Sequence, residues 1–275
     1  MTVLFDSHCH LQDPAFAGKV GEAIERAATA GVGALLVLGY NVPSNHSALE
    51  IASRHGGVAF AAVGIHPHDA VSAAHSDLEG TAALARLPEV LAIGEIGLDF
   101  YRNLSPPEKQ VEVLRAQLEI ALDVGKPVSV HSRGAEDKLV AHLSSFAVDW
   151  QERYADRSPG VMHCFGGSAR EARSYAEMGF MISLACTVTY PKNETTREVA
   201  ASLDSSSILV ETDSPYLPPQ ASRGQRNEPA NVVVAAKAVA DARGSSLEEV
   251  ARLTTANAER LFGISVRRPA AAGAS

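Results

Sequence analysis

Six apolar, strand-like segments of this chain each end in a histidine or a carboxylate. The segments are VLFDSHCH, AFAAVGIHPH, VLAIGEIGLD, PVSVHSR, GVMHCF and ILVETD, and they deliver His8, His10, His66, His68, Glu95, Asp99, His131, His163, Glu211 and Asp213. In a barrel of parallel strands, the carboxyl ends of the strands converge on one face, so residues far apart in sequence become neighbours. The pattern therefore predicts a metal site on the rim of a βα barrel.

Helical patterns alternate with the strand-like segments. Ser168 and Glu171 have the spacing of a capping pair, and so do Ser246 and Glu249. Strict alternation of strand and helix implies parallel strands joined by helical crossovers. Helices are predicted over residues 105–125, from 168 to 179 and from 246 onward, and near 18–30, 44–55, 75–87, 192–204 and 231–243.

Alternation alone allows either an open sheet or a closed barrel. An open sheet gathers its ligands where the strand order reverses, whereas here polar residues end six strand-like segments, which favours closure. We therefore predict an α/β fold, a (β/α)8 TIM barrel. The 275 residues suit one domain, which we place at 1–265, and we expect 266–275 to be a disordered tail because RRPAAAGAS lacks apolar periodicity. SHCHLQDP stands where a glycine-rich dinucleotide motif would follow the first strand, which disfavours a nucleotide cofactor.

Composition limits the setting and the partners. Three cysteines cannot pair completely, which indicates a reducing compartment, and we predict a cytoplasmic protein. The sequence shows neither a signal peptide nor an apolar run of about 18 residues, so no membrane association is predicted. The net charge of -8 restricts any nucleic-acid partner to a local groove or to contacts through metal. A monomer is the default expectation.

The histidines and carboxylates suit divalent cations. His8 and His10 lie two residues apart at a strand end, so both imidazoles can reach one ion. Nitrogen and carboxylate ligands suit zinc, manganese or iron, and magnesium is accommodated when carboxylates and phosphate complete the shell. We expect Glu95 to bridge one ion held by His8, His10 and Asp213 and a second held by His131 and His163. Such a pair of ions, about 3.5 to 4 Å apart, would activate water against a phosphodiester, with Asp213 as general base.

Seven motifs together resemble the TatD family of metal-dependent hydrolases in the amidohydrolase superfamily. They are DSHCHL, GIHPH, GEIGLDFYR, PVSVHSR, MHCFGG, ETDSPYL and RGQRNEP, in this order, and the resemblance covers nearly the whole chain. The resemblance implies a (β/α)8 barrel, two divalent cations (Mg, Mn or Zn) and 3′ to 5′ exonuclease activity on single-stranded DNA or RNA. It also implies that His8, His10, Glu95, His131, His163 and Asp213 are the metal ligands and that glutamate, rather than a modified lysine, bridges the metals.

Other residues of these motifs are candidates for substrate binding. We assign His66 to a phosphate oxygen rather than to metal, the alternative being a structural loop contact. Arg133, Arg223 and Arg226 could clamp phosphate oxygens through their guanidinium groups, and Tyr101 could contact substrate beside them. Alternatively, each arginine is simply exposed to solvent without binding substrate, and Tyr101 only holds its loop by hydrogen bonds.

One segment departs from the family pattern. The chain reads ISLACTVTYPKN where many members carry a Ser-Gly pair, so Leu184, Ala185 and Cys186 are expected to alter the cavity wall and the substrate preference. Two other functions stay open. The same metal site could hydrolyse a small-molecule ester, amide or lactone, an alternative that the acidic net charge favours, or the barrel could be a non-catalytic scaffold.

Overall fold

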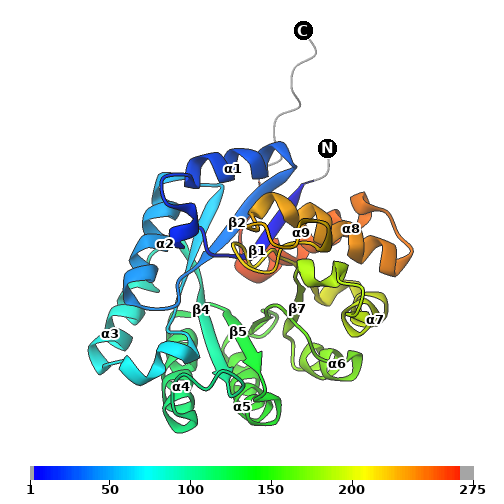
Figure 1. Ribbon diagram of the computed structural model, residues 1–275. Helices are drawn as coiled ribbons and strands as arrows, with labels where there is room; N and C mark the ends of the chain where they lie inside the picture. The colour runs from blue at the N-terminus through cyan, green and yellow to red at the C-terminus, as the bar shows by residue number, and fades with distance from the viewer. Residues whose placement is uncertain (1–2, 267–275) are drawn as a thin grey trace.

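A computed structural model describes residues 3–266, and eight parallel strands form its centre (Figure 1). Their order in the sheet follows the sequence from β1 to β8. The helices surround the strands, so the predicted (β/α)8 barrel is confirmed. The strands are β1 (Leu4–Cys9), β2 (Val32–Leu38), β3 (Ala59–Val63), β4 (Val90–Asp99), β5 (Val128–Arg133), β6 (Gly160–Met162), β7 (Met181–Leu184) and β8 (Ile208–Val210).

Nine α-helices occur among the described residues. They are α1 (Val20–Thr29), α2 (Val42–Arg54), α3 (His75–Leu84), α4 (Pro107–Val124), α5 (Glu136–Tyr154), α6 (Ala169–Glu177), α7 (Glu194–Ser202), α8 (Val232–Arg243) and α9 (Leu247–Phe262). Short 3-10 helices lie in the loops at Pro14–Phe16, Pro67–Ser72, Cys186–Thr189, Ser205–Ser207, Gln220–Ser222 and Pro229–Asn231. Within residues 3–266, we find no helix with both the length and the apolarity to cross a bilayer.

Local sequence signals explain the predicted helix ends. Gly125 ends α4 in the left-handed conformation, with φ of 65°, a backbone angle that glycine adopts without steric cost. At the start of α6, the Ser168 hydroxyl accepts from the Glu171 amide, and the Glu171 carboxylate accepts from the Ser168 amide at 2.7 Å. The capping pair predicted there is confirmed.

The helix α5 was not among the predicted helices, although it is the longest in the described chain. Its buried residues Leu139, Leu143, Phe146 and Trp150 recur at helical spacing. Its amino end offers no cap, because Ala135 stands at the capping position. The helix is stabilised by its apolar face against the barrel rather than by a start signal.

Alternate residues of the strands face two separate cores. One set packs under the helices, and the other fills the barrel interior with side chains such as Phe5, Leu36 and Leu209. The end of α9 belongs to the interior set, since the Phe262 ring lies 5.5 Å from the Phe5 ring. Because α9 closes this end of the barrel, the open face is left at the carboxyl ends of the strands. Of the predicted tail at 266–275, only Val266 lies within the described residues.

The barrel closes where β8 meets β1, and we call this junction the seam. Hydrogen bonds between residues at the two strand ends hold it together. The Asp213 amide donates to the His8 carbonyl at 2.9 Å, and the His10 amide donates to the Ser214 carbonyl at 2.7 Å. Further inside, the buried Asp6 carboxylate accepts from both the amide and the hydroxyl of Thr212, at 2.9 and 2.6 Å. The side chain of Asp6 thus serves as the acceptor that a continuous strand ladder would otherwise supply.

Asp6 is expected to make the metal-free protein less stable as pH rises. Burial, helped by the charge of Glu211, raises the pKa of Asp6 to about 8, although hydrogen bonds from Thr212 oppose the shift. The folded-state pKa of Asp6 lies above its unfolded value. The contribution of Asp6 to the free energy of unfolding is therefore fully present below about pH 4, where the carboxyl group is protonated in both states. It is lost as pH rises toward 8, at about 1.4 kcal/mol per pH unit.

The variant Asp6→Asn mimics the protonated acid and is expected to remove this pH dependence. In urea unfolding with EDTA, its free energy of unfolding should equal that of the wild type near pH 4. At pH 7 it should exceed the wild-type value by roughly 2 to 4 kcal/mol. Parallel pH profiles for the two proteins would show that Asp6 does not carry the effect.

Candidate metal centre

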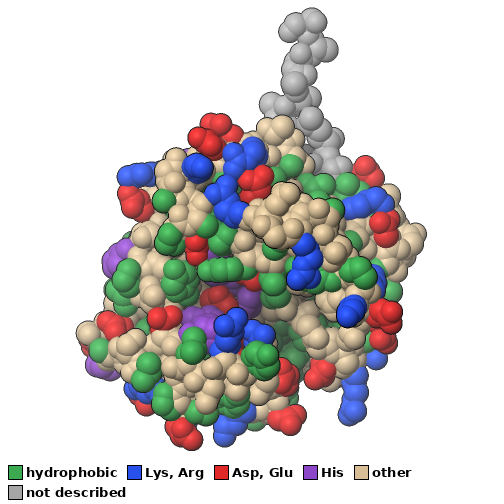
Figure 2. All heavy atoms as spheres, in the orientation of Figure 1, with side chains coloured by type: hydrophobic (Ala, Val, Ile, Leu, Met, Phe, Trp, Pro, Cys, Tyr) green, Lys and Arg blue, Asp and Glu red, His purple; other side chains and the backbone are tan. Residues whose placement is uncertain are grey.

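The structure brings the six residues predicted as metal ligands to one place. His8 lies in β1 and His10 just after it, while Glu95 and His131 lie in β4 and β5. His163 and Asp213 follow β6 and β8. A cavity of about 850 Å³ opens over these strand ends, and five of the six residues line it, whereas His8 is fully buried behind them. Figure 2 shows the hollow, with histidine and acidic side chains inside and basic side chains at its edge.

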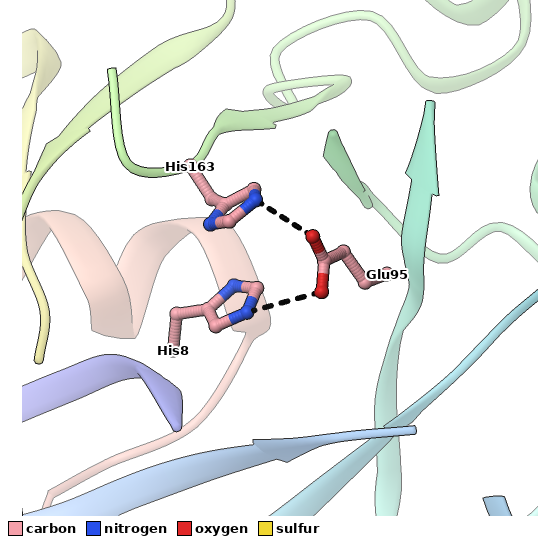
Figure 3. A group of neighbouring side chains, drawn as sticks. All are labelled: His8, Glu95 and His163. Carbon is pink, nitrogen blue, oxygen red and sulfur yellow. Dashed lines mark ion pairs between the residues drawn. The ribbon is translucent and has the colours of Figure 1, made fainter. Parts of the chain in front are cut away.

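Glu95 lies between two sets of imidazoles. Its Oε2 is 3.5 Å from Nε2 of both His8 and His10. Its Oε1 is 2.9 Å from His163 Nε2 and 3.1 Å from His131 Nδ1. Figure 3 shows the two oxygens pointing toward His163 and His8, respectively. One carboxylate therefore serves both halves of the centre.

Two of the imidazoles are oriented by a partner outside the centre. His10 Nδ1 lies 2.9 Å from the Leu38 carbonyl, which leaves Nε2 facing Asp213 Oδ1 at 3.5 Å. His131 Nε2 lies 3.3 Å from Asp99. Such contacts place the ring proton on the outward nitrogen and leave a lone pair facing inward.

Glu211 takes a similar position behind His163, at ion-pair distance but without a hydrogen bond to the ring. Its Oε1 lies 3.5 Å from His163 Nδ1 and accepts from the Cys164 amide at 2.7 Å. These contacts place the Glu211 carboxylate behind the centre, next to the outer nitrogen of His163 and the backbone of Cys164. His8 Nδ1 is also buried without a hydrogen-bond partner among the described residues.

The spacing of the inward nitrogens fits divalent cations. His8 Nε2 and His10 Nε2 are 3.1 Å apart, and His131 Nδ1 and His163 Nε2 are 3.2 Å apart. When two nitrogens bind the same ion at about 2.1 Å, with a nitrogen–ion–nitrogen angle between about 90° and 109°, they lie about 3.0 to 3.4 Å apart. The donor set therefore fits the cations that the sequence predicts, in chemistry and in spacing.

Electrostatics in the centre favours charged carboxylates. In the metal-free protein burial opposes the charged form of Glu95, but positive charge on protonated imidazoles, above all His163, and the hydrogen bonds that protonated His131 and His163 donate outweigh it and hold the pKa well below its usual range. For Asp213 burial is likewise outweighed, by a hydrogen bond from His10 and by nearby imidazole charge, and the pKa is lowered. Two anionic groups within a buried cluster call for compensating cations.

His66 differs from the other histidines in the nitrogen it presents. Its Nδ1 accepts a hydrogen bond from the His68 amide at 3.1 Å, so the proton of the neutral ring lies on Nε2. Burial lowers the pKa of His66, which favours that neutral ring. Nε2 faces Glu95 Oε1 at 3.3 Å. His66 thus offers the centre an N–H donor rather than a lone pair.

Two of the predicted substrate-binding residues stack on each other near the mouth. Arg133 lines the cavity, and its guanidinium carbon lies 4.2 Å from the centre of the Tyr101 ring. Tyr101 itself is 70% exposed and is not among the described residues that line the cavity. Arg102, its neighbour, does line it.

The two arginines after β8 are placed differently. Arg223 lies over the Tyr190 ring at 4.7 Å, and Arg226 lies over the Phe16 ring at 4.6 Å. Arg226 also donates to the Ala15 carbonyl. Neither guanidinium belongs to the cavity wall formed by residues 3–266. Their assignment to phosphate stays a prediction.

The expectation for the segment after β7 is wrong in one respect. Leu184, Ala185 and Cys186 are all buried, and within the described chain none of them lines the cavity. They pack behind the wall instead, where Cys186 Sγ lies 3.5 Å from the Asn231 carbonyl. The side chains that depart from the usual family pattern therefore do not themselves form the described surface of the cavity.

Several residues of the site escaped sequence reasoning. Tyr40, Tyr175 and Tyr216 line the cavity, as do Glu136 and Glu171. Glu136, Glu171 and Tyr175 lie on α5 and α6, and Tyr40 and Tyr216 lie in the loops after β2 and β8. The signal that identified the histidines was a metal-ligand residue at the end of an apolar run, and none of these five residues fits it.

Comparison with known proteins agrees with these observations. Residues 5–263 match the family model described as TatD related DNase. The chain belongs to the TatD family. It is 37% identical to the metal-dependent hydrolase YabD of Bacillus subtilis over 262 residues, which cover 95% of this chain and all of YabD. It is 36% identical to the 3′-5′ ssDNA/RNA exonuclease TatD of Klebsiella pneumoniae, over 96% of this chain and 99% of that protein.

Comparison with a solved structure supports the same family. The TatD homologue YjjV of Escherichia coli is 32% identical and superposes with a TM-score of 0.87, over 95% of this chain and 98% of YjjV. The chain is thus a metal-dependent hydrolase of the TatD family, and its centre contains groups of histidine and carboxylate residues suited to hold metal.

Proposed function

We propose that this TatD-family protein is a nuclease that removes nucleotides from single-stranded DNA or RNA in the 3′ to 5′ direction. The observation that carries the proposal is the position of Glu95, with one oxygen toward His8 and His10 and the other toward His131 and His163. This arrangement suits two divalent cations held side by side. Names carried by its bacterial relatives support the nucleic-acid substrate.

In this proposal six residues would hold divalent cations, which would be magnesium, manganese or zinc. His8, His10 and Asp213 would hold one cation and His131 and His163 a second, with Glu95 shared between them. When bound, such cations lower the pKa of a coordinated water and offset the negative charge of a phosphodiester. The other steps depend on side chains of this chain.

Asp213 accepts the proton of the attacking water, which requires a charged carboxylate at neutral pH. The lowered pKa of Asp213 supplies that state. His66 donates its Nε2 proton in a hydrogen bond to a phosphate oxygen, a role that its tautomer fits. Arg133 at the mouth adds positive charge for the strand, and Tyr101 keeps the guanidinium in place by stacking.

We also propose the setting in which the nuclease works. Residues 1–265 act as one domain, and the protein is a monomer in the cytoplasm. The three cysteines, Cys9, Cys164 and Cys186, are all free thiols, which fits a reducing compartment.

A second function has specific support from the cavity wall. Asp69, Glu136 and Glu171 line it together with the arginines. Their negative charge disfavours a polyanion in their part of the cavity and suits a neutral ester, amide or lactone. The same activated water attacks a carbonyl carbon as well as a phosphorus atom.

An assay of cleavage separates the two functions. The purified protein is stripped with EDTA, supplied with Mg²⁺, Mn²⁺ or Zn²⁺, and incubated with end-labelled single-stranded DNA, RNA and duplex DNA. We expect stepwise shortening of the single strands that EDTA abolishes. Intact oligonucleotides with all three metals, together with hydrolysis of small esters or lactones, would establish the second function instead.

Asp99 is expected to strengthen metal binding by orienting His131. Its Oδ2 lies 2.8 Å from His68 Nε2 as well as 3.3 Å from His131 Nε2, while Oδ1 accepts from the Arg102 amide at 2.7 Å. We expect Asp99→Ala to weaken Mn²⁺ or Zn²⁺ binding by about 10 to 100-fold, the usual effect of losing a carboxylate behind a metal-binding histidine.

Calorimetric titration of the metal-free protein measures this effect without any substrate. Asp99→Asn is expected to recover part of the affinity, because its amide oxygen can still accept from the imidazole. The exposed Asp123 on α4 provides the matched control, as Asp123→Ala. Equal affinities for the wild type and Asp99→Ala would remove Asp99 from the proposed centre.

A further inference from the structure

An exposed apolar surface lies beside the mouth of the cavity, on the loops that follow β3 and β4. Tyr101 is 70% exposed, Leu104 is 60% exposed and Val71 is 58% exposed. The two loops are joined, because the Val71 amide donates to the Ser105 hydroxyl at 2.9 Å. Figure 2 shows hydrophobic side chains beside basic ones along the edge of the hollow. Large apolar side chains exposed together at the edge of a site indicate a binding surface.

Buried groups hold the loop that carries Tyr101. Asp99 Oδ1 accepts from the amides of Tyr101 and Arg102, at 3.1 and 2.7 Å. The side chain of Gln110 is 1% exposed and donates to the carbonyls of Asp99 and Ser105, at 3.1 and 2.7 Å. A side chain on a fixed loop loses little conformational freedom when a ligand covers it. The position of Tyr101 is therefore prepared for a partner.

One face of the Tyr101 ring is covered, and the other is open. The guanidinium carbon of Arg133 lies 4.2 Å from the centre of the ring, while the high exposure of Tyr101 leaves the other face to solvent. Arg133 and Arg102 both line the cavity. Arginine beside an exposed aromatic ring suits single-stranded nucleic acid, whose phosphates pair with the guanidinium and whose bases stack on the ring.

The direction of the proposed reaction brings the strand to this side of the mouth. Strands β4 and β8 lie four positions apart in the ring of eight, so they are on opposite sides of the barrel. Asp213, the proposed base, follows β8, and the water that it deprotonates approaches the phosphorus atom from the β8 side. In an in-line displacement the leaving oxygen departs on the opposite side, which here is toward β4 and β5.

We propose that Tyr101 is a stacking platform for a base of the strand that remains after cleavage. The water oxygen bonds to phosphorus and the bond from phosphorus to the 3′ oxygen of that strand breaks. Asp213 takes a proton from the water, and the 3′ oxygen takes one from solvent. The released nucleotide carries a 5′-phosphate, while the remaining strand leaves over β4 and β5, past Arg133 to Tyr101.

This inference rests on the proposed nuclease function and adds two properties to it. The first is a preference for single strands, because a base that is paired and stacked in a duplex cannot lie flat on the Tyr101 ring. The second is a binding contact outside the cavity, since Tyr101 is not among the described residues that line it. That contact is made by a nucleotide other than the one that is released.

The test removes the Tyr101 ring and, separately, the base that would stack on it. The substrate is a 5′-labelled single-stranded 12-mer with Mg²⁺ or Mn²⁺, either intact or with an abasic residue at the second, third or fourth position from the 3′ end. For the wild type, kcat/KM of the first cleavage is expected to fall about tenfold when the abasic residue occupies one of these positions, as for the loss of one stacked base.

The variants are expected to respond differently. Tyr101→Ala should lower kcat/KM on the intact strand about tenfold and should lose the sensitivity to the abasic residue, because the stacking partner is already absent. Tyr101→Phe keeps the ring and should behave as the wild type. The matched control is Val148→Ala on α5, which shortens another apolar side chain, 60% exposed, and should leave every rate unchanged.

Three results would overturn the platform while the nuclease function stands. One is a wild type that cleaves the strands but is insensitive to an abasic residue at all three positions. Another is an equal loss for Tyr101→Ala on intact and abasic strands, which would mean that Tyr101 only holds Arg133 against a phosphate. The third is release of nucleoside 3′-monophosphates, identified by chromatography, because the leaving oxygen would then belong to the terminal nucleotide. If no oligonucleotide is cleaved with any metal, both proposals fail.

Discussion

Replacing Glu95 by glutamine is expected to remove most of the bound metal and to lower kcat/KM on single-stranded DNA by about a thousandfold or more. Glutamine has nearly the same shape but offers one neutral oxygen in place of two charged ones. The NH2 group of the amide would face one of the two imidazole sets that the Glu95 oxygens now face at 2.9 to 3.5 Å. Metal content by mass spectrometry and the oligonucleotide assay measure both effects.

The matched control for this variant is Glu112→Gln on α4, which changes an exposed glutamate whose ion pair within residues 3–266 is with Lys109. Its metal content and turnover should match the wild type. Circular dichroism is expected to show that Glu95→Gln remains folded, because the barrel core under the helices and inside the strands is untouched. Two equivalents of metal and full turnover in Glu95→Gln would refute the bridging role.

Asp213→Asn is expected to reduce kcat by about 10² to 10⁴-fold while retaining much of the metal. General bases contribute factors of this size, and an amide cannot accept the proton of water. His8, His10 and Glu95 still face the same position, so metal binding weakens less than turnover. The substitution suits the backbone, since Asp213 has φ of 56° and asparagine tolerates the left-handed region well.

The comparison of kcat with metal affinity decides the role of Asp213. Asp123→Asn, at an exposed position, controls for the loss of one negative charge. An unchanged kcat at saturating metal would show that Asp213 does not act as the base. A fall in kcat that excess metal fully restores would assign Asp213 to metal binding alone.

The positions of the six proposed ligands were predictable because they depend on local sequence and on one rule of topology. A histidine or carboxylate at the end of an apolar run is visible in the sequence, and parallel strands around a barrel bring those ends together. The orientation of each imidazole was not predictable. His10 is oriented by the Leu38 carbonyl, 28 residues away, and His131 by Asp99, which lies on the neighbouring strand.

The positions of residues outside the strand ends were harder to predict, because they also depend on contacts with residues that are distant in sequence. Long arginine side chains can reach several surfaces, and Arg226 packs on Phe16 instead of lining the cavity. The helix α5 lacks a capping residue, so its start carries no local signal. Tyr175 reads as an ordinary apolar-face residue of α6 until the fold shows that its hydroxyl is unpaired.

The seam between β1 and β8 has a consequence for when the enzyme becomes active. Asp213 enters the centre only after β8 has been added beside β1 and its amide has bonded to the His8 carbonyl. A chain still in synthesis holds the four histidines and Glu95 but lacks the proposed proton acceptor. On the proposed role of Asp213, a chain that lacks β8 cannot carry out the hydrolysis, so activity begins only with the complete barrel.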